Sequence, residues 1–305
     1  MTTLPIDSQL PEIQAVVRGG RDLILRAEPG AGKTTRVPPA LLDAVPGQVL
    51  VLEPRRLAAR LAAAYIAESL GERVGGTVGY HIRLERAFSL RTRLKFITEG
   101  LFLKYLARDP GLAGVDCLVL DEFHERHLHT DVALAVARQL QRTRRPDLRL
   151  VVMSATLDTE RLAAWFGDAV VLDVPGRVHP VAEEFLPQPD RRSLDTGVRA
   201  AAAELLADPR CPGHVLVFLS GAADIRRCAE ALAPLATRTG ARVLPLMAEL
   251  PLARQQEALA PSAARKIILA TKVAETSVTI DGVTGVVDPG LAKIPDFAPW
   301  SGLPT

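Results

Sequence analysis

The stretch that decides the fold is Ala27-Glu28-Pro29-Gly30-Ala31-Gly32-Lys33-Thr34, which follows an apolar run and opens a helical pattern. Glycine-rich turns between a strand and a helix let successive backbone N–H groups curl around a phosphate at the positive end of the helix. In such a turn the ammonium of Lys33 would lie between the β- and γ-phosphates, and the hydroxyl of Thr34 would bind Mg²⁺. The sequence therefore predicts a nucleoside-triphosphate site made by Gly30, Ala31, Gly32, Lys33, Thr34 and Thr35.

One position departs from the common phosphate-loop pattern, because Ala27 stands where that pattern has its first glycine. Alanine is small, and this position does not require the positive φ that favours glycine, so we treat the departure as minor. The alternative is a glycine-rich turn that carries a lysine by chance. The strand before the turn and the helix after it argue against this alternative.

Apolar runs of strand length alternate along the chain with amphipathic helical patterns such as Leu57–Leu70 and Leu128–Gln141. Strands that are apolar throughout indicate parallel sheets covered by helices on both faces. The predicted strands are Asp22–Ala27, Val49–Leu52, Leu94–Ile97, Cys117–Leu120, Leu150–Met153, Val170–Val174, Val215–Leu219, Val243–Leu246, Lys266–Ala270 and Val283–Val287. A proline-rich stretch at 175–189 interrupts the series, so we expect two consecutive α/β domains, residues 1–175 and 176–305.

Composition and charge agree with a globular protein of about two domains, with 305 residues, 48% hydrophobic and 24% charged. No run approaches the roughly 18 uninterrupted apolar residues of a membrane helix, and the N-terminus lacks a signal-peptide pattern, so we expect no membrane partner. Three scattered cysteines fit a reducing cytoplasm. The net charge of +2 does not by itself indicate a nucleic-acid-binding protein. Any phosphate-binding surface must therefore come from the local placement of arginines.

A second chemical motif, Asp121-Glu122-Phe123-His124, follows the predicted strand Cys117–Leu120. Carboxylates at the tip of a buried parallel strand point into the crevice where open α/β sheets bind ligands. We expect Asp121 to hold Mg²⁺ and Glu122 to act as general base toward the attacking water. We expect His124 to report the nucleotide state to the second domain. An ordinary acidic helix start is the alternative, and the spacings of His124, His127 and His129 do not match a zinc pattern.

Taken with both motifs, the whole chain resembles the DEAH-box branch of superfamily 2 helicases, most of all the bacterial HrpB-type. Asp-Glu-Phe-His at 121–124 and Pro-Gly-Ala-Gly-Lys-Thr-Thr-Arg-Val-Pro at 29–38 carry this resemblance. Further matches, in the family's order, are Leu52–Ala59, Val78–Arg83, Thr98–Gly100, Ser154–Thr156, Phe218–Gly221, Thr271–Asp281 and Val286–Gly290.

This resemblance implies two RecA-like domains that hydrolyse ATP with Mg²⁺ and move along or unwind RNA, with DNA left open. The residues implied to contact the sugar-phosphate backbone are Arg55, Arg56, Thr98, Ser220 and Thr271. Ser154 and Thr156 are implied to couple the nucleotide cleft to the nucleic acid, and Ser277 and Asp281 to face the nucleotide from the second domain. For the arginines the alternative is a solvated helix start, and for Ser154 and Thr156 it is a helix cap.

The sequence also departs from the family pattern. Lys272 stands where the family usually has asparagine, and the arginine-rich motif VI does not occur before Thr305. We therefore expect a second domain that is incomplete and a chain truncated before motif VI. The missing arginines favour one alternative to an active helicase, a truncated nucleotide- and RNA-binding module with little hydrolysis. Another alternative is a P-loop NTPase that acts as a structural switch on a protein partner. Tyr65 is a candidate stacking partner for the base, although a core position on its helix is the simpler expectation.

Overall fold

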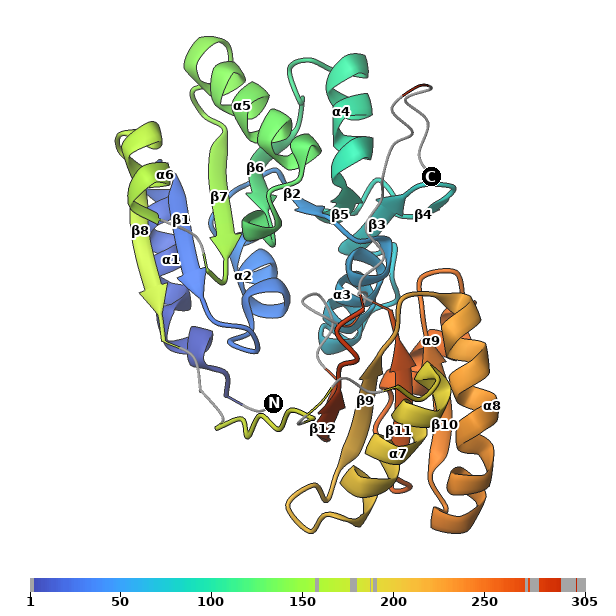
Figure 1. Cartoon of the computed structure of the whole chain (residues 1–305). Coiled ribbons are helices and arrows are strands. Elements are labelled where there is room, and N and C mark those ends of the chain that lie inside the picture. The colour runs from blue at the N-terminus through green and yellow to red at the C-terminus, as the bar shows by residue number, and fades with distance from the viewer. Residues whose placement is uncertain are drawn as a thin grey trace. The chain divides into compact units, whose positions relative to one another are not determined.

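The computed structural model describes residues 3–156, 159–175, 180–186, 188, 191–271, 274, 280–291 and 300. The chain divides into two units, residues 1–180 and 181–305, and each contains its own sheet (Figure 1). The sequence placed this division after residue 175.

An eight-stranded sheet forms the centre of the first unit, in the order β4-β3-β5-β2-β6-β7-β1-β8. Its strands are β1 (Leu23–Ala27), β2 (Gln48–Glu53), β3 (Val78–Ile82), β4 (Glu85–Ala87), β5 (Leu94–Thr98), β6 (Val115–Leu120), β7 (Arg149–Ser154) and β8 (Val170–Val174). Among the described strands of this sheet, β4 alone runs antiparallel to its neighbour, β3, at the edge. The sheet is therefore mixed, whereas the apolar runs predicted parallel pairing only.

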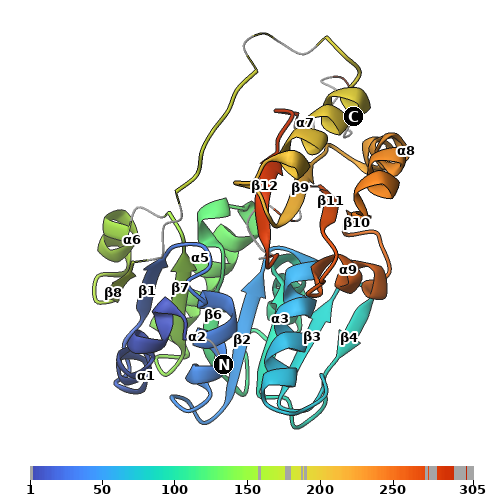
Figure 2. The ribbon, with the colours of Figure 1, turned by 90° about the horizontal axis from the view of Figure 1, so that it is seen from below.

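Helices cover both faces of this sheet because its strands are apolar on both sides. They are α1 (Leu10–Arg18), α2 (Lys33–Leu41), α3 (Arg56–Ser69), α4 (Glu99–Arg108), α5 (Leu128–Thr143) and α6 (Thr159–Phe166), with 3-10 turns η1 (Pro5–Gln9) and η2 (Phe123–Glu125). One core cluster packs α1, α2 and α3 on one face, and a second packs α4, α5 and α6 on the other. Figure 2 shows α1, α2 and α3 on the same side of the sheet.

The second unit repeats the α/β plan around a four-stranded parallel sheet in the order β10-β11-β9-β12. Its strands are β9 (His214–Phe218), β10 (Arg242–Leu246), β11 (Lys266–Ala270) and β12 (Val283–Val287). Its helices are α7 (Leu194–Ala207), α8 (Ala222–Thr239) and α9 (Leu252–Leu259). Strand β11 is buried along its whole length, as the apolar run Ile267–Ala270 that follows Lys266 predicts.

All ten strands predicted from the sequence are present, with ends shifted by at most two residues. Strands β3 and β4 were not predicted, because Val-Gly-Tyr-His-Ile is not a simple apolar run and Glu-Arg-Ala is polar. The expectation for Tyr65 was wrong, since its side chain on α3 is 51% exposed and does not belong to the core. Among the helices of the described residues, none combines the length and apolar character that a membrane span needs.

A buried polar network anchors the strand that leads into the phosphate loop. Asp22, just before β1, accepts hydrogen bonds from Arg138 and Gln141 of α5 and from the backbone N–H of Leu150 in β7. Two elements, α5 and β7, are thus tied to one buried carboxylate. Strand β1 therefore begins at a position fixed by α5 and β7.

Candidate functional site

The turn between β1 and α2 has the shape expected of a phosphate loop. Helix α2 begins at Lys33, and its N-cap, Gly32, has no side chain that could satisfy the first backbone N–H groups. The Lys33 side chain is buried and its Nζ donates to the carbonyl oxygens of Ala27 at 2.5 Å and Glu28 at 3.3 Å. The positive end of the helix and one ammonium thus converge on this turn, which suits an anion.

Two glycines of this turn adopt backbone conformations that other residues avoid. Gly30 has φ of 77° and Gly32 has φ of 96°. A Cβ on Gly32 would also lie 2.7 Å from Cδ1 of Leu4, so this glycine makes room for the N-terminal segment of the chain. Ile6 in η1 donates its backbone N–H to the carbonyl of Ala31, which holds this segment against the turn.

Thr34 and Asp121 lie side by side although they are 87 positions apart in the chain. The hydroxyl of Thr34 donates to Oδ2 of Asp121 at 2.5 Å, and Asp121 follows β6 directly, where it is fully buried. A hydroxyl and a carboxylate that already touch fit one Mg²⁺, which binds few protein ligands and takes the rest from phosphates and water. Among the described residues no group of three or more His, Cys, Asp and Glu side chains is placed to hold a metal by itself.

Glu122 is buried at the same strand tip, in an uncommon backbone conformation. Its φ is 49°, and its backbone N–H donates to Oδ1 of Asp121 at 2.8 Å. Desolvation by burial, followed by the charge of Asp121, raises the pKa of Glu122 to about 8. Burial also raises the pKa of Asp121, against the lowering effects of Thr34 and Lys33. A carboxyl with a raised pKa in such a position is typical of general acid–base chemistry.

His124 lies between the general-base candidate and the strand that ends in Ser154. Its Nδ1 is 3.5 Å from Oε2 of Glu122 and 3.5 Å from the backbone nitrogen of Ala155, which donates to it. A ring nitrogen that accepts a hydrogen bond in this way carries no proton. Desolvation by burial, the largest cause, lowers the pKa of His124, in agreement with that state.

Sequence reasoning missed Glu53, the last residue of β2, which lies beside β6 in the sheet. Its side chain is 1% exposed, and both carboxyl oxygens are buried without a hydrogen-bond partner in the described part of the chain. Burial, followed by the charges of Asp121, Glu122 and Glu125, raises the pKa of Glu53 well above its ordinary value. The sequence does show a carboxylate at the end of an apolar run, which is a position typical of site residues. It does not show that this carboxylate is buried.

Replacing Glu53 with leucine is expected to stabilise the first unit by about 1–3 kcal/mol at neutral pH, because it removes an unsatisfied buried group of similar size. The folded pKa of Glu53 lies above its ordinary value of 4.5, so the wild type loses stability as the pH rises from that value. The gain in the variant should therefore grow from acidic to neutral pH. Urea unfolding at several pH values measures this gain in the free energy of unfolding. An equal or lower stability of the variant would contradict the conclusion that Glu53 is an unsatisfied buried group.

The residues implied to contact nucleic acid in the first unit follow β2 and β5. Arg56 is the first residue of α3 and is exposed, whereas Arg55, the N-cap, forms an ion pair with Oε1 of Glu125 at 3.2 Å. Thr98 is the N-cap of α4 and is partly buried. All three lie at the carboxyl edge of neighbouring strands, because Glu53 and Thr98 are partners in the pairing of β2 with β5.

A chain of polar contacts that the sequence did not predict joins the loops after β6 and β5. Nε2 of His127 lies 3.5 Å from Oε2 of Glu125, and its Nδ1 lies 3.4 Å from Oε2 of Glu99. The other oxygen of Glu99 accepts a hydrogen bond from the hydroxyl of Thr130 in α5. Glu99 belongs to a different segment from Glu125, His127 and Thr130, so the folded chain brings these two segments together.

Ser154 and Thr156 occupy the carboxyl end of β7, next to β1. Ser154 is buried and its hydroxyl oxygen has no hydrogen-bond partner among the described residues, whereas Thr156 is exposed. The helix-cap alternative for this motif involves residues 157 and 158, which lie outside the described residues.

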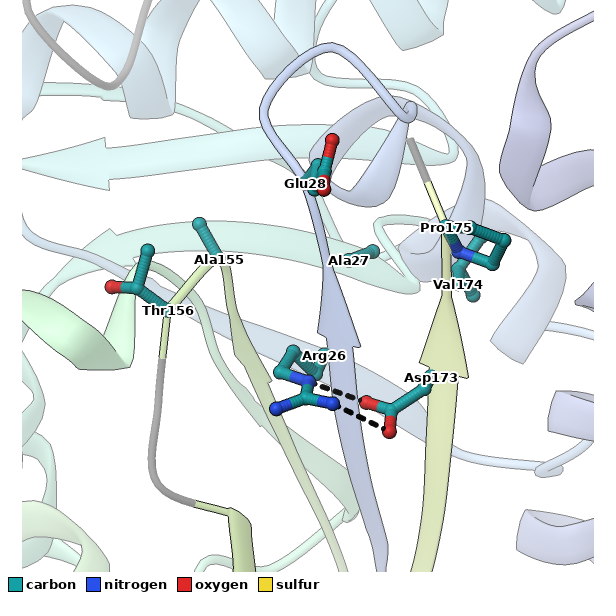
Figure 3. Close-up of a pocket in the computed structure, with 8 residues that line it drawn as sticks. All are labelled: Arg26, Ala27, Glu28, Ala155, Thr156, Asp173, Val174 and Pro175. Atoms are coloured by element: carbon teal, nitrogen blue, oxygen red, sulfur yellow. Dashed lines mark hydrogen bonds and ion pairs between the residues drawn. The ribbon is translucent and has the colours of Figure 1, made fainter. Parts of the chain in front are cut away.

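Thr156 also lines a pocket of about 400 Å³ beside the phosphate loop (Figure 3). Arg26 and Asp173 face each other across neighbouring strands at its base and form two hydrogen bonds of 2.6 and 2.8 Å. The other lining residues are Ala27, Glu28, Ala155, Val174 and Pro175. The motif at 154–156 and the phosphate loop thus border one hollow of the first unit.

Two of the site residues assigned to the second unit, Ser220 and Thr271, follow neighbouring strands, because Phe218 of β9 is paired with Ala270 of β11. Ser220 donates its hydroxyl to Asp224 at the start of α8, and this hydrogen bond is the largest cause that lowers the pKa of Asp224. Thr271 follows β11, and its backbone N–H donates to the carbonyl of Leu246 at 3.3 Å. Asp281 is exposed in a turn before β12. Ser277 lies outside the described residues.

Comparison with solved structures places the fold among RecA-like helicases. The crystal structure of the Escherichia coli DEAH/RHA helicase HrpB matches with a TM-score of 0.90 and 41% identity, over 99% of this chain and 39% of that one.

Sequence comparison points the same way. The chain is 42% identical to the ATP-dependent RNA helicase HrpB of E. coli over 99% of its own length and 38% of that protein. It is 37% identical to an ATP-dependent RNA helicase HrpA homolog of Haemophilus influenzae over 97% of its length and 23% of that relative. The chain thus spans well under half the length of these curated relatives. The family model described as DEAD/DEAH box helicase matches residues 7–164, more than half of the chain, and the chain belongs to this family.

Proposed function

We propose that this chain binds ATP with Mg²⁺ and couples ATP hydrolysis to movement along, or unwinding of, RNA. The observation that carries this proposal is the 2.5 Å hydrogen bond between Thr34 and Asp121. It joins the two residues that would hold one Mg²⁺, and it lies at the end of a helix whose first backbone N–H groups are uncapped. The similarity to the ATP-dependent RNA helicase HrpB supports the same activity.

Each residue of the phosphate site would have a separate role. The backbone of Gly30, Ala31 and Gly32, with Thr35 in the first turn of α2, would surround the phosphates, and Lys33 would neutralise their charge. Mg²⁺, held by Thr34 and Asp121, supplies further charge neutralisation when bound. Glu122 would orient the attacking water and take its proton on a carboxylate oxygen, and the protonated Glu122 would then be able to donate to Nδ1 of His124, 3.5 Å away.

Nucleic acid would bind at the carboxyl edges of the strands through its sugar-phosphate backbone, so binding should depend on salt more than on base sequence. The proposed contacts are Arg55, Arg56, Thr98, Ser220 and Thr271. Ser154 and Thr156 would couple this binding to the nucleotide, and Ser277 and Asp281 would contact the nucleotide from the second unit. DNA carries the same backbone charge and is the second candidate substrate. The free cysteines fit a cytoplasmic location.

The test is steady-state ATP hydrolysis by this chain with and without single-stranded RNA and DNA of equal length. Turnover that depends on Glu122 and rises with RNA supports the proposal. Nucleotide binding without turnover would favour a binding module, and turnover that ignores both nucleic acids would favour a structural switch. Either of those two results would overturn the helicase assignment for this chain.

A further inference from the structure

Arg55, which we propose as a phosphate contact, already binds a carboxylate of its own chain. Its terminal nitrogen lies 3.2 Å from Oε1 of Glu125, and the two side chains are only 21% and 12% exposed. A guanidinium binds carboxylates and phosphates through the same planar set of N–H donors. Glu125 therefore engages a donor that a backbone phosphate would otherwise use.

The position of Glu125 is fixed from two sides. Its second carboxylate oxygen lies 3.5 Å from Nε2 of His127, which in turn lies 3.4 Å from Glu99. Its backbone N–H donates to the carbonyl of Glu122 at 3.0 Å, within the 3-10 turn η2. These contacts restrict the carboxylate of Glu125. The ion pair with Arg55 is therefore better ordered than a pair of long, mobile surface side chains.

The start of α3 also has an unbalanced charge that this carboxylate offsets. Arg55 and Arg56 stand at the positive end of the helix, and the first turn contains no acidic residue. Cations at this end of a helix are destabilising, so an anion from outside the helix is favourable there. Glu125 supplies that anion in the structure, and a nucleic-acid phosphate would supply it equally well.

We propose that Glu125, held by His127, is an internal competitor for Arg55 that sets how tightly this site binds the phosphates of single-stranded RNA. Nucleic acid that binds at Arg55 must displace the Glu125 carboxylate. Glu125 lies in the 3-10 turn η2, which follows Glu122 directly. Displacement of its carboxylate therefore changes the position of a charge close to the proposed general base. This inference rests on the proposed role of Arg55 in RNA binding.

The experiment measures the affinity of a fluorescein-labelled oligouridylate by fluorescence anisotropy over a series of salt concentrations. Glu125→Gln keeps the size of the side chain and removes its charge, so we expect about three- to tenfold tighter binding. The slope of the salt dependence should stay the same in this variant, because the same phosphate contact forms in both chains, whereas Arg55→Ala should make it shallower by about 0.7, the contribution of one phosphate contact on a single strand. Glu125→Asp, which is too short to reach Arg55, should also bind more tightly, and it serves if the glutamine variant does not fold.

The matched control is Glu68→Gln, an exposed residue near the other end of α3 that changes the net charge equally. Arg55→Ala should weaken binding, and adding Glu125→Gln to it should have no further effect. If Arg55→Ala weakens binding but neither Glu125 variant binds more tightly than Glu68→Gln, the competitor role is wrong and the RNA contact stands. If Arg55→Ala leaves the affinity unchanged, the proposed RNA contact itself fails.

Discussion

Replacing Lys33 with alanine is expected to lower the affinity for MgATP by about 100-fold or more, the largest binding effect of any single change in this chain. A hydrogen-bonded charge on a buried anion contributes about 1.5–3 kcal/mol, and Lys33 would meet two phosphates at once. The side chain is 6% exposed and already points at the carbonyl oxygens of the turn, so the free chain holds its ammonium close to the predicted phosphate position.

Titration with a fluorescent ATP analogue in the presence of Mg²⁺ measures this loss. Lys104→Ala is the matched control, because it removes the same charge from an exposed position on α4. Because removal of Lys33 leaves two loop carbonyls without their donor, circular dichroism is used to establish that the variant is folded before its affinity is compared. An unchanged affinity for ATP in a folded Lys33→Ala variant would remove the basis of the ATP site.

The strands of both units could be predicted because burial on both faces leaves a direct trace in the sequence. Runs such as Leu150–Met153 and Ile267–Ala270 are apolar throughout, and the structure buries all of their residues. The short, polar edge strand β4 leaves no such trace, although the apolar edge strands β8, β10 and β12 do. Strand β4 is three polar or small residues, and it pairs with β3 on one side only, so pattern reasoning had nothing to detect.

The candidate site was predictable where topology alone brings residues together. The ends of parallel strands meet at one edge of a sheet, so Thr34 after β1 and Asp121 after β6 could be expected close to each other. Glu53 and Glu125 belong to the same edge but were not predicted. Glu53 matters because it is buried without a hydrogen-bond partner, and Glu125 matters because it pairs with Arg55. A single sequence reveals neither burial nor side-chain partners.

Glu122→Gln is expected to retain ATP binding and to lower the rate of hydrolysis by about 10²–10⁴, the usual contribution of a general base. Glutamine has the same shape, so it can fill the site and remove the repulsion with Asp121, but it cannot take the proton of the attacking water. Glu28→Gln is the control, because Glu28 is an exposed carboxylate of the phosphate loop. Retained turnover in Glu122→Gln would exclude the general-base role.

The pH dependence of hydrolysis tests the same residue by a second route. Burial and the charge of Asp121 raise the pKa of Glu122 to about 8, so in the free protein most of this group is protonated at pH 7 and cannot accept a proton. Because kcat/KM reports the ionisation of the free enzyme, it should increase as the pH rises toward about 8 and level off above that value. The residual activity of Glu122→Gln should lack this increase. A kcat/KM that is flat between pH 6 and about 8 in the wild type would mean that another group, or the nucleotide itself, accepts the proton.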